Sequence, residues 1–215
     1  MDKIHIELLT EERKQTWDDF VDDSNNGTIF HKQKFLSYHK DKFKDNEHHL
    51  LFYQGSQLIS VLPLAIFESK GEKIAKSPYG ASFGGFVYKK VTYSNVSRII
   101  KSFKEYAIEN NFDKIIITPP PLIYHTRFET YQDFCLLKEG FKIVNRDITN
   151  IIELQKIKTN NLFDLYKYSC VKQIQKASRL NITVKEIGIL KSFYDILIEN
   201  RKKHNVIPVH SFSEL

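Results

Sequence analysis

The sequence predicts a mixed fold, in the α/β or α+β class with a mixed sheet, and three observations support this class. Short runs alternate apolar and polar residues, which is typical of strands, whereas other segments repeat apolar residues at helical spacing. Strand-like and helix-like segments also follow one another along the chain instead of forming two blocks. Finally, 215 residues with 41% hydrophobic content suffice for a packed core in one large domain or two small ones.

Residues 1–148 predict a first domain with the element order β, α, α, β, β, β, α, β, α, β. The predicted strands are 4–8, 49–53, 57–67, 73–77, 115–117 and 141–148. The predicted helices begin after Thr10, surround Phe35, and span 93–111 and 131–138. Thr10 is an N-cap residue type, and Gly140 suits the C′ position after the last of these helices.

Residues 149–215 predict a second unit that repeats the opening order and then stops. Its expected elements are a strand at 151–154, one or two helices at 162–180, a strand at 182–187 and a helix at 189–205. A unit of about 65 residues does not readily close a separate mixed-sheet domain. We therefore expect one complete domain followed by an incomplete or docked second one.

Charge and cysteine content narrow the classes of function. The net charge is +6, but lysines are interspersed with acids, as in the segment 40–45, so nucleic acid is not expected as the primary target. An anionic substrate remains open. Two cysteines suit a reducing compartment, and no apolar run approaches the roughly 20 residues of a transmembrane segment, so a cytoplasmic protein is expected.

The segment 77–86 is the most distinctive in the chain, because it holds three of the eight glycines, at Gly80, Gly84 and Gly85. Glycine permits positive φ and close approach of another group, so this loop predicts either a ligand site or a tight turn. Its Gly-x-Ser-x-Gly pattern also fits a nucleophile elbow, which needs a helix directly after the serine. Here residues 85–88 look extended, and the context therefore disfavours a hydrolase serine.

Histidines, cysteines and one basic helix face are further candidate groups. Adjacent His48 and His49 face opposite sides of a strand, and no set of ligands has the spacing of a metal site, so no metal is expected. Cys135 and Cys170 lie in apolar helical contexts that favour buried structural thiols. The basic face formed by Lys172, Lys176 and Arg179 predicts either a solvated surface or a contact with an anion.

The rigid loop at 119–121 is followed by Tyr124 and His125 at the carboxyl end of a predicted strand, where ligands of α/β sheets often bind. We expect this loop and the glycine loop to frame one cleft, with Tyr79 and Tyr124 presenting exposed rings.

Several segments resemble those of the GNAT acyltransferases, specifically the FemAB-like branch found with bacterial cell-envelope polysaccharide functions. The segments that carry the resemblance are 27–31, 62–64, 77–80 with Gly84 and Gly85, 137–141 and 200–204 with Pro208. The resemblance implies transfer of an acyl or aminoacyl group to an amine on a sugar or cell-envelope precursor. The implied donor is acyl-CoA or an aminoacyl compound, and the implied partner is a small molecule or a nucleotide-sugar.

The chain departs from that family in two respects. It ends inside what would be the second GNAT-like half, and it lacks the Arg/Gln-x-x-Gly-x-Gly/Ala signature that cradles the pyrophosphate of coenzyme A. A non-catalytic binding or interaction module is therefore the alternative to an enzyme, and either a homo-oligomer or a missing C-terminal half is expected to complete the fold.

Residue chemistry and the resemblance together give the candidate site. The candidates for catalysis are Tyr79, Tyr124 and His204. The candidates for substrate binding are Ser77, Tyr79, Gly80, Gly84, Gly85, Tyr124, Lys176 and Arg201. The backbone amides of Gly84 and Gly85 are expected to stabilise the oxyanion of the transition state.

Overall fold

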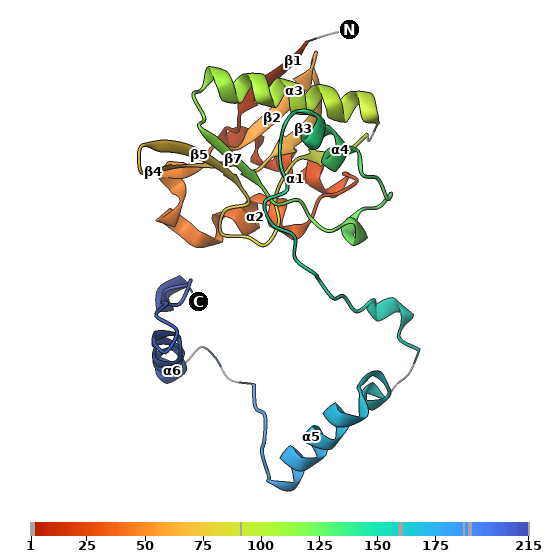
Figure 1. Cartoon of the computed structure of the whole chain (residues 1–215), viewed down its shortest axis with the longest axis vertical. Coiled ribbons are helices and arrows are strands. Elements are labelled where there is room, and N and C mark those ends of the chain that lie inside the picture. The colour runs from red at the N-terminus through yellow and green to blue at the C-terminus, as the bar shows by residue number, and fades with distance from the viewer. Residues whose placement is uncertain (1–2, 91, 159–160, 187, 189–190, 215) are drawn as a thin grey trace. The chain divides into compact units, whose positions relative to one another are not determined.

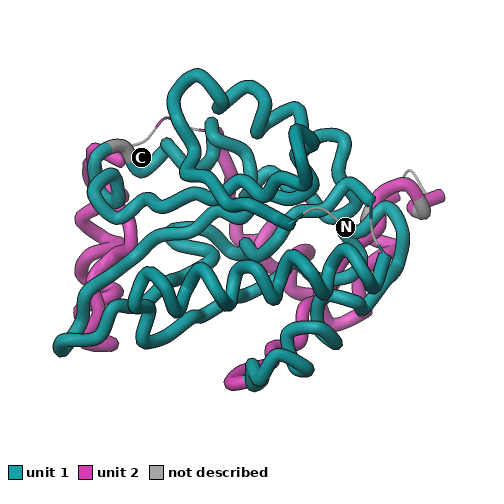
Figure 2. Tube along the Cα trace, turned by 90° about the horizontal axis from the view of Figure 1, so that it is seen from above, with its two compact units in different colours: residues 1–143 teal, residues 144–215 magenta. Residues whose placement is uncertain are grey.

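The computed structural model describes residues 3–90, 92–158, 161–186, 188 and 191–214. The chain forms two compact units, unit 1 from Met1 to Ile143 and unit 2 from Val144 to Leu215 (Figure 2). Each unit is described by itself below.

Unit 1 contains two sheets, one antiparallel and one of mixed strand direction (Figure 1). Its strands are β1 (Ile4–Leu8), β2 (Leu50–Gln54), β3 (Gln57–Leu62), β4 (Ala65–Ser69), β5 (Glu72–Ser77), β6 (Val87–Tyr88) and β7 (Lys114–Ile117). The first sheet has the order β1-β2-β3-β6 and is antiparallel throughout. The second has the order β4-β5-β7, in which β5 and β7 are parallel. The predicted mixed α/β class is therefore confirmed.

Helices cover these sheets and supply the connection that parallel strands require. The helices of unit 1 are α1 (Lys14–Asp22), α2 (Gln33–Leu36), α3 (Tyr93–Glu109) and α4 (Tyr131–Lys138). Because parallel strands cannot be joined by a tight hairpin, α3 lies in the connection between β5 and β7. Its apolar face enters the main core, where Ile100 and Phe103 pack with Phe52 of β2 and Phe86 of the glycine loop.

The boundary between the sheets falls inside a segment predicted as one strand, 57–67. Pro63 has no N–H group to donate to a ladder, and the chain leaves β3 at Leu62 and enters β4 at Ala65. The glycine loop 78–86 makes the reverse passage, from β5 in the second sheet to β6 in the first. The chain therefore passes between the two sheets twice, first between β3 and β4 and then through the glycine loop.

Unit 2 contains two helices, α5 (Tyr168–Arg179) and α6 (Lys191–Lys202), and its described residues form no strand. The strands predicted at 141–148, 151–154 and 182–187 are therefore wrong over the described residues; residue 187 lies outside them. Ile148 and Val184 are more than nine-tenths exposed, so these alternating runs have no partner strand to pair with. Alternation favours a strand only where an adjacent strand satisfies the backbone groups.

Other local predictions have mixed outcomes. Gly140 follows α4 at φ +95°, as expected for a C′ glycine. Thr10 precedes a 3₁₀ turn, Glu11–Arg13, but its side chain makes no capping bond to the backbone, so that prediction is wrong. In the described parts of the chain, no helix combines the length and the apolar character needed to cross a bilayer.

Candidate functional site

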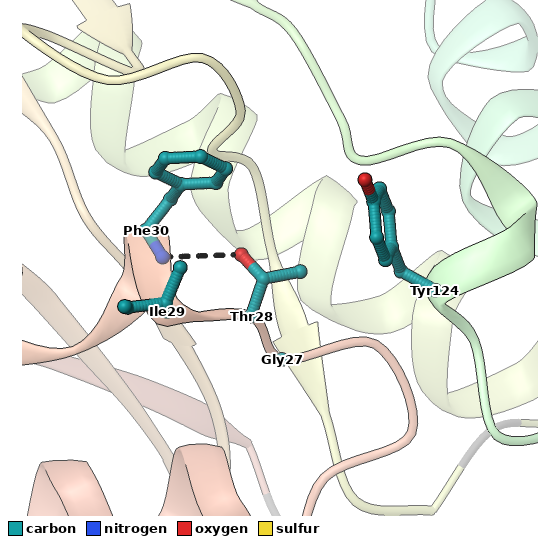
Figure 3. Close-up of a pocket in the computed structure, with 5 residues that line it drawn as sticks. All are labelled: Gly27, Thr28, Ile29, Phe30 and Tyr124. Carbon is teal, nitrogen blue, oxygen red and sulfur yellow. Dashed lines mark hydrogen bonds between the residues drawn. The ribbon is translucent and has the colours of Figure 1, made fainter. Parts of the chain in front are cut away.

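Unit 1 contains a hollow of about 380 Å³ between two loops (Figure 3). Gly27, Thr28, Ile29 and Phe30 form one wall, and Tyr124 faces them from the other. This volume lies in the range of small-molecule sites, which are mostly apolar with few polar groups. Tyr124 is a predicted site residue, whereas the segment 27–31 was expected only as part of the family resemblance and not as a wall of a site.

Two asparagines hold the walls together. The Asn26 side chain donates to the Phe86 carbonyl (2.8 Å) and accepts from the Tyr88 amide (3.0 Å). Asn25 accepts from the Arg127 amide (2.8 Å) and donates to the Arg127 carbonyl (3.1 Å). Both asparagines are buried. The wall that follows Asn26 is therefore fixed to β6 and to the loop that carries Tyr124.

Thr28 supplies the polar side chain of the first wall. Its Oγ1 accepts from the Phe30 amide (3.2 Å) and lies 3.0 Å from Nδ1 of the buried His31, which also accepts from the Thr28 amide (3.1 Å). Burial lowers the pKa of His31 to about 4, so the imidazole is neutral at pH 7. Because Nδ1 is an acceptor, the Thr28 hydroxyl directs its proton to His31. One lone pair remains, and the hydroxyl can accept a hydrogen bond from a ligand N–H or O–H.

Aromatic rings join the glycine loop to the hollow. The Phe83 ring centroid lies 5.6 Å from that of Phe30 and 5.9 Å from that of Tyr124. Phe35 contacts Phe30 from α2 at 4.9 Å. Phe83 thus brings the glycine loop and the 119–124 loop into contact beside the hollow.

The glycines of this loop are required by the protein's own packing. A Cβ on Gly84 would lie 2.7 Å from the Pro78 nitrogen, and one on Gly80, which has φ +61°, would lie 2.2 Å from His39 Nε2. The Gly84 amide donates to the Thr118 carbonyl (2.9 Å), and the Gly85 amide donates to the Ser77 hydroxyl (2.8 Å). The expectation that the amides of residues 84 and 85 form an oxyanion hole is therefore wrong, because both are already used. Ser77 is fully buried and closes the loop.

Tyr79 was expected to present an exposed ring, and this is wrong. The side chain is buried, and its hydroxyl donates to the Glu47 carboxylate (3.1 Å) and lies 3.0 Å from His49 Nε2. His49 Nδ1 accepts from the Leu64 amide (3.3 Å), so Nε2 carries the proton and donates to Tyr79. Burial lowers the pKa of His49 to about 3 and raises the pKa of Glu47. Tyr79 therefore belongs to a satisfied polar network in the core.

Two predictions from local context are confirmed: no helix directly follows Ser82, and the adjacent His48 and His49 contact different partners. Ser82 is exposed and is followed by β6, whereas the next helix begins only at Tyr93. His48 contacts the Tyr106 hydroxyl (2.7 Å), while its neighbour His49 contacts Tyr79.

The remaining candidates belong to unit 2. Lys176 lies on α5, Arg201 lies in the last turn of α6 and His204 follows that helix; all three are exposed. The basic face of α5 is a solvent-exposed surface among the described residues. Cys135 is buried as expected, but Cys170 on α5 is exposed, so its predicted burial is wrong. The α5 helix has no buried residue against which a thiol could pack.

No family model matches the chain, and no curated protein matches it. Solved structures that it resembles include a GNAT-family acetyltransferase from Staphylococcus aureus, with 12% identity and a TM-score of 0.42 over 70% of this chain and 99% of that one. They also include a transcriptional regulator from Bacillus halodurans, with 15% identity and a TM-score of 0.44 over 69% and 99% of the two chains. A third is the ribosomal-protein-alanine N-acetyltransferase of Brucella melitensis, with 12% identity and a TM-score of 0.42 over 71% and 99%.

Proposed function

We propose that this protein is an N-acyltransferase whose acyl acceptor binds in the hollow between residues 27–30 and Tyr124. The finer proposal is a FemAB-like reaction, in which an acyl or aminoacyl group is transferred to an amine on a sugar or cell-envelope precursor. One observation carries the proposal: an aromatic hollow contains a threonine hydroxyl whose proton is already committed to His31. That hydroxyl selects for a ligand that donates a hydrogen bond, as amines and sugars do.

The residues of the hollow would hold the acceptor molecule in the following way. Phe30 and Tyr124 present aromatic faces to its ring or apolar part, and Thr28 accepts from one of its N–H or O–H groups. In the reaction, the amine nitrogen attacks the acyl carbonyl carbon, a C–N bond forms, and the bond from that carbon to the donor's sulfur or oxygen breaks. The amine loses one proton to a base, and the leaving group gains one.

The acyl donor is a substrate of this reaction, and the start of α3 bears on its chemical class. Residues 89–92, between β6 and α3, contain no glycine, Thr92 accepts from the Asn95 amide (3.3 Å), and Lys89 pairs with Asp23 (3.1 Å). These contacts leave no glycine-lined cradle for a pyrophosphate at the start of α3. We therefore expect coenzyme A to bind weakly or not at all, and we favour an aminoacyl donor.

The test is product formation by the full chain with two donors. Acetyl-coenzyme A and an aminoacyl-tRNA are each incubated with a panel of amino sugars, and N-acylated products are detected by mass spectrometry. Thr28→Val should lower kcat/KM about tenfold or more, because an N–H or O–H group of the bound amino sugar then has no oxygen to which it can donate. Thr28→Ser should retain activity, and Tyr93→Phe serves as a control at an exposed tyrosine outside the hollow.

Two outcomes would oppose the proposal. Absence of product with either donor, while amino sugars still bind to the hollow, would favour the non-catalytic binding module. Full activity of Thr28→Val would show that the reaction takes place elsewhere.

A further inference from the structure

The positive charge of the chain is concentrated in unit 2. Residues 144–215 contain twelve lysines and arginines against seven acids, and they account for five of the six net charges. The segment between Asp164 and Glu186 contains no acid at all. Its basic residues are Lys167, Lys172, Lys176, Arg179 and Lys185. Helix α5 lies within this segment, so its positive charge is not offset by any carboxylate nearby along the chain.

The α5 helix separates its charged side chains from its apolar ones. At 3.6 residues per turn, the apolar side chains share one face, which consists of Cys170, Val171, Ile174 and Ala177. The basic side chains lie on the opposite face, which consists of Lys172, Lys176 and Arg179. The helix is therefore amphipathic, with a polar face that is strongly basic.

The apolar side chains of this segment are not packed into a core. No residue of α5 is buried, and Ile174 on its apolar face is 39% exposed. Large apolar side chains on both sides of the helix and at its start are exposed as well: Phe163, Leu165, Tyr166, Tyr168, Leu180 and Ile182. Apolar side chains that gather on an exposed surface mark a site of interaction with a protein or a membrane.

Charge and apolar character together select the partner. A nucleic acid would contact the basic face and leave the apolar face in water. A second copy of α5 would bring like charges together. An anionic bilayer satisfies both faces, because the apolar face enters the boundary of the acyl chains while the lysines stay within a Debye length of the phosphates. Tyrosines such as Tyr166 and Tyr168 suit the level of the headgroups.

We propose that the segment 163–185, with α5 at its centre, is a docking surface for an anionic lipid bilayer. The helix lies in the plane of the membrane surface and does not cross it. This proposal goes beyond acyl transfer, since it concerns residues of unit 2 alone, whereas the hollow is formed by residues of unit 1.

The experiment measures sedimentation of the full chain with lipid vesicles. Vesicles of equal parts phosphatidylcholine and phosphatidylglycerol should bind the protein, whereas vesicles of phosphatidylcholine alone should not. About 1 M sodium chloride should release it, because the Debye length then falls to about 3 Å. An environment-sensitive thiol dye reports on the apolar face, because Cys170 is exposed and Cys135 is buried. Its emission should shift to the blue on the anionic vesicles.

Variants then assign the binding to the two faces of α5. Combined replacement of Lys172, Lys176 and Arg179 by Gln, a good helix former, should weaken vesicle binding about a hundredfold, at about fivefold per charge. Ile174→Gln leaves the charge unchanged and should weaken binding severalfold. The matched control removes three exposed lysines of unit 1 and should retain most of the binding; its substitutions are Lys34→Gln, Lys44→Gln and Lys114→Gln.

Three results would overturn the proposal. The first is no sedimentation with the anionic vesicles, and the second is equal binding to phosphatidylcholine alone. The third is an equal loss of binding in the unit 1 control, which would mean that only the net charge matters. Binding of polyuridylate with an unshifted dye and without vesicle binding would assign the basic face to RNA instead. No acyl donor or amine is present in these measurements, so their failure leaves the proposed function intact, and a failure to transfer acyl groups leaves the docking surface intact.

Discussion

Tyr79 and Tyr88 are buried in unit 1 on either side of the glycines at 80, 84 and 85, but their hydroxyl groups differ in their surroundings. The Tyr79 hydroxyl donates to Glu47 and accepts from His49, so it both donates and accepts a hydrogen bond. The Tyr88 hydroxyl is fully buried and has no hydrogen-bond partner. The glycine loop is therefore flanked by one tyrosine whose hydroxyl is hydrogen-bonded and by one whose hydroxyl is not.

The difference has a simple energetic meaning. A buried polar group with a hydrogen-bond partner stabilises the fold. A buried polar group without a partner lowers the free energy of unfolding, because it has lost its hydration and gained no hydrogen bond. Removal of the hydroxyl should therefore have opposite effects on stability at Tyr79 and at Tyr88.

The strongest predicted effect is on the pH dependence of stability, through two buried imidazoles. His31 and His49 are neutral when folded, with pKa values of about 4 and about 3 against 6.5 in the unfolded chain. As pH falls below 6.5, the unfolded state takes up protons that the folded state refuses, so the free energy of unfolding falls. Above pH 6.5 the stabilisation is complete, and between pH 6.5 and about 4 each imidazole should contribute a slope of about 1.4 kcal/mol per pH unit.

Urea unfolding between pH 7 and pH 5 measures this slope. Replacing His49 by Gln should remove roughly half of it, since one of the two depressed imidazoles is gone. A flat profile over that range would mean that both histidines are hydrated and that the core is more open than the structure shows.

Next in size is the effect of a side chain at Gly84. Gly84→Ala places a Cβ 2.6 Å from Ser77 Oγ and 2.7 Å from the Pro78 nitrogen, and the Pro78 backbone cannot move away cheaply. The free energy of unfolding should fall by about 3 kcal/mol. Gly71→Ala is the matched control: it has φ +81° and no atom within 4 Å, and should cost only about 1 kcal/mol. Equal losses in urea unfolding would show that crowding at residue 84 is relieved.

Removing the Tyr79 hydroxyl should have a smaller effect. Tyr79→Phe deprives the buried His49 N–H of its acceptor and Glu47 of a donor. Loss of about 2 kcal/mol is expected, because the imidazole remains buried without a partner. Tyr93→Phe, at an exposed hydroxyl bonded to Lys138 (2.7 Å), should change stability by less than about 0.5 kcal/mol.

The smallest effect has the opposite sign and tests the comparison most directly. Tyr88→Phe removes a buried hydroxyl that has no partner, so the free protein should become more stable by about 1 kcal/mol. Denaturant unfolding of the two variants side by side gives the answer. If Tyr88→Phe loses as much stability as Tyr79→Phe, the Tyr88 hydroxyl is paired in solution and the two regions do not differ.

Local patterns predicted a large part of the fold of unit 1. The helices now seen as α3 and α4 and the strands β1, β2, β5 and β7 coincide with their predicted segments to within two residues, because helical and strand periods depend on near neighbours. Gly140 likewise ends α4 through its own φ. The strands predicted after residue 140 failed for the complementary reason: a strand needs a partner, and a period of two does not say whether one exists.

The mixed α/β class, the course of the main helices and the presence of Tyr124 in an exposed loop after a strand all follow from local sequence patterns. Which loops meet depends on long-range contacts. Asn25 and Arg127 are 102 residues apart and Asn26 and Phe86 are 60 apart, yet these bonds build the hollow. The same folding buries Tyr79 and uses up the amides of Gly84 and Gly85. Such outcomes depend on which distant groups satisfy each buried polar atom, and no local pattern carries that information.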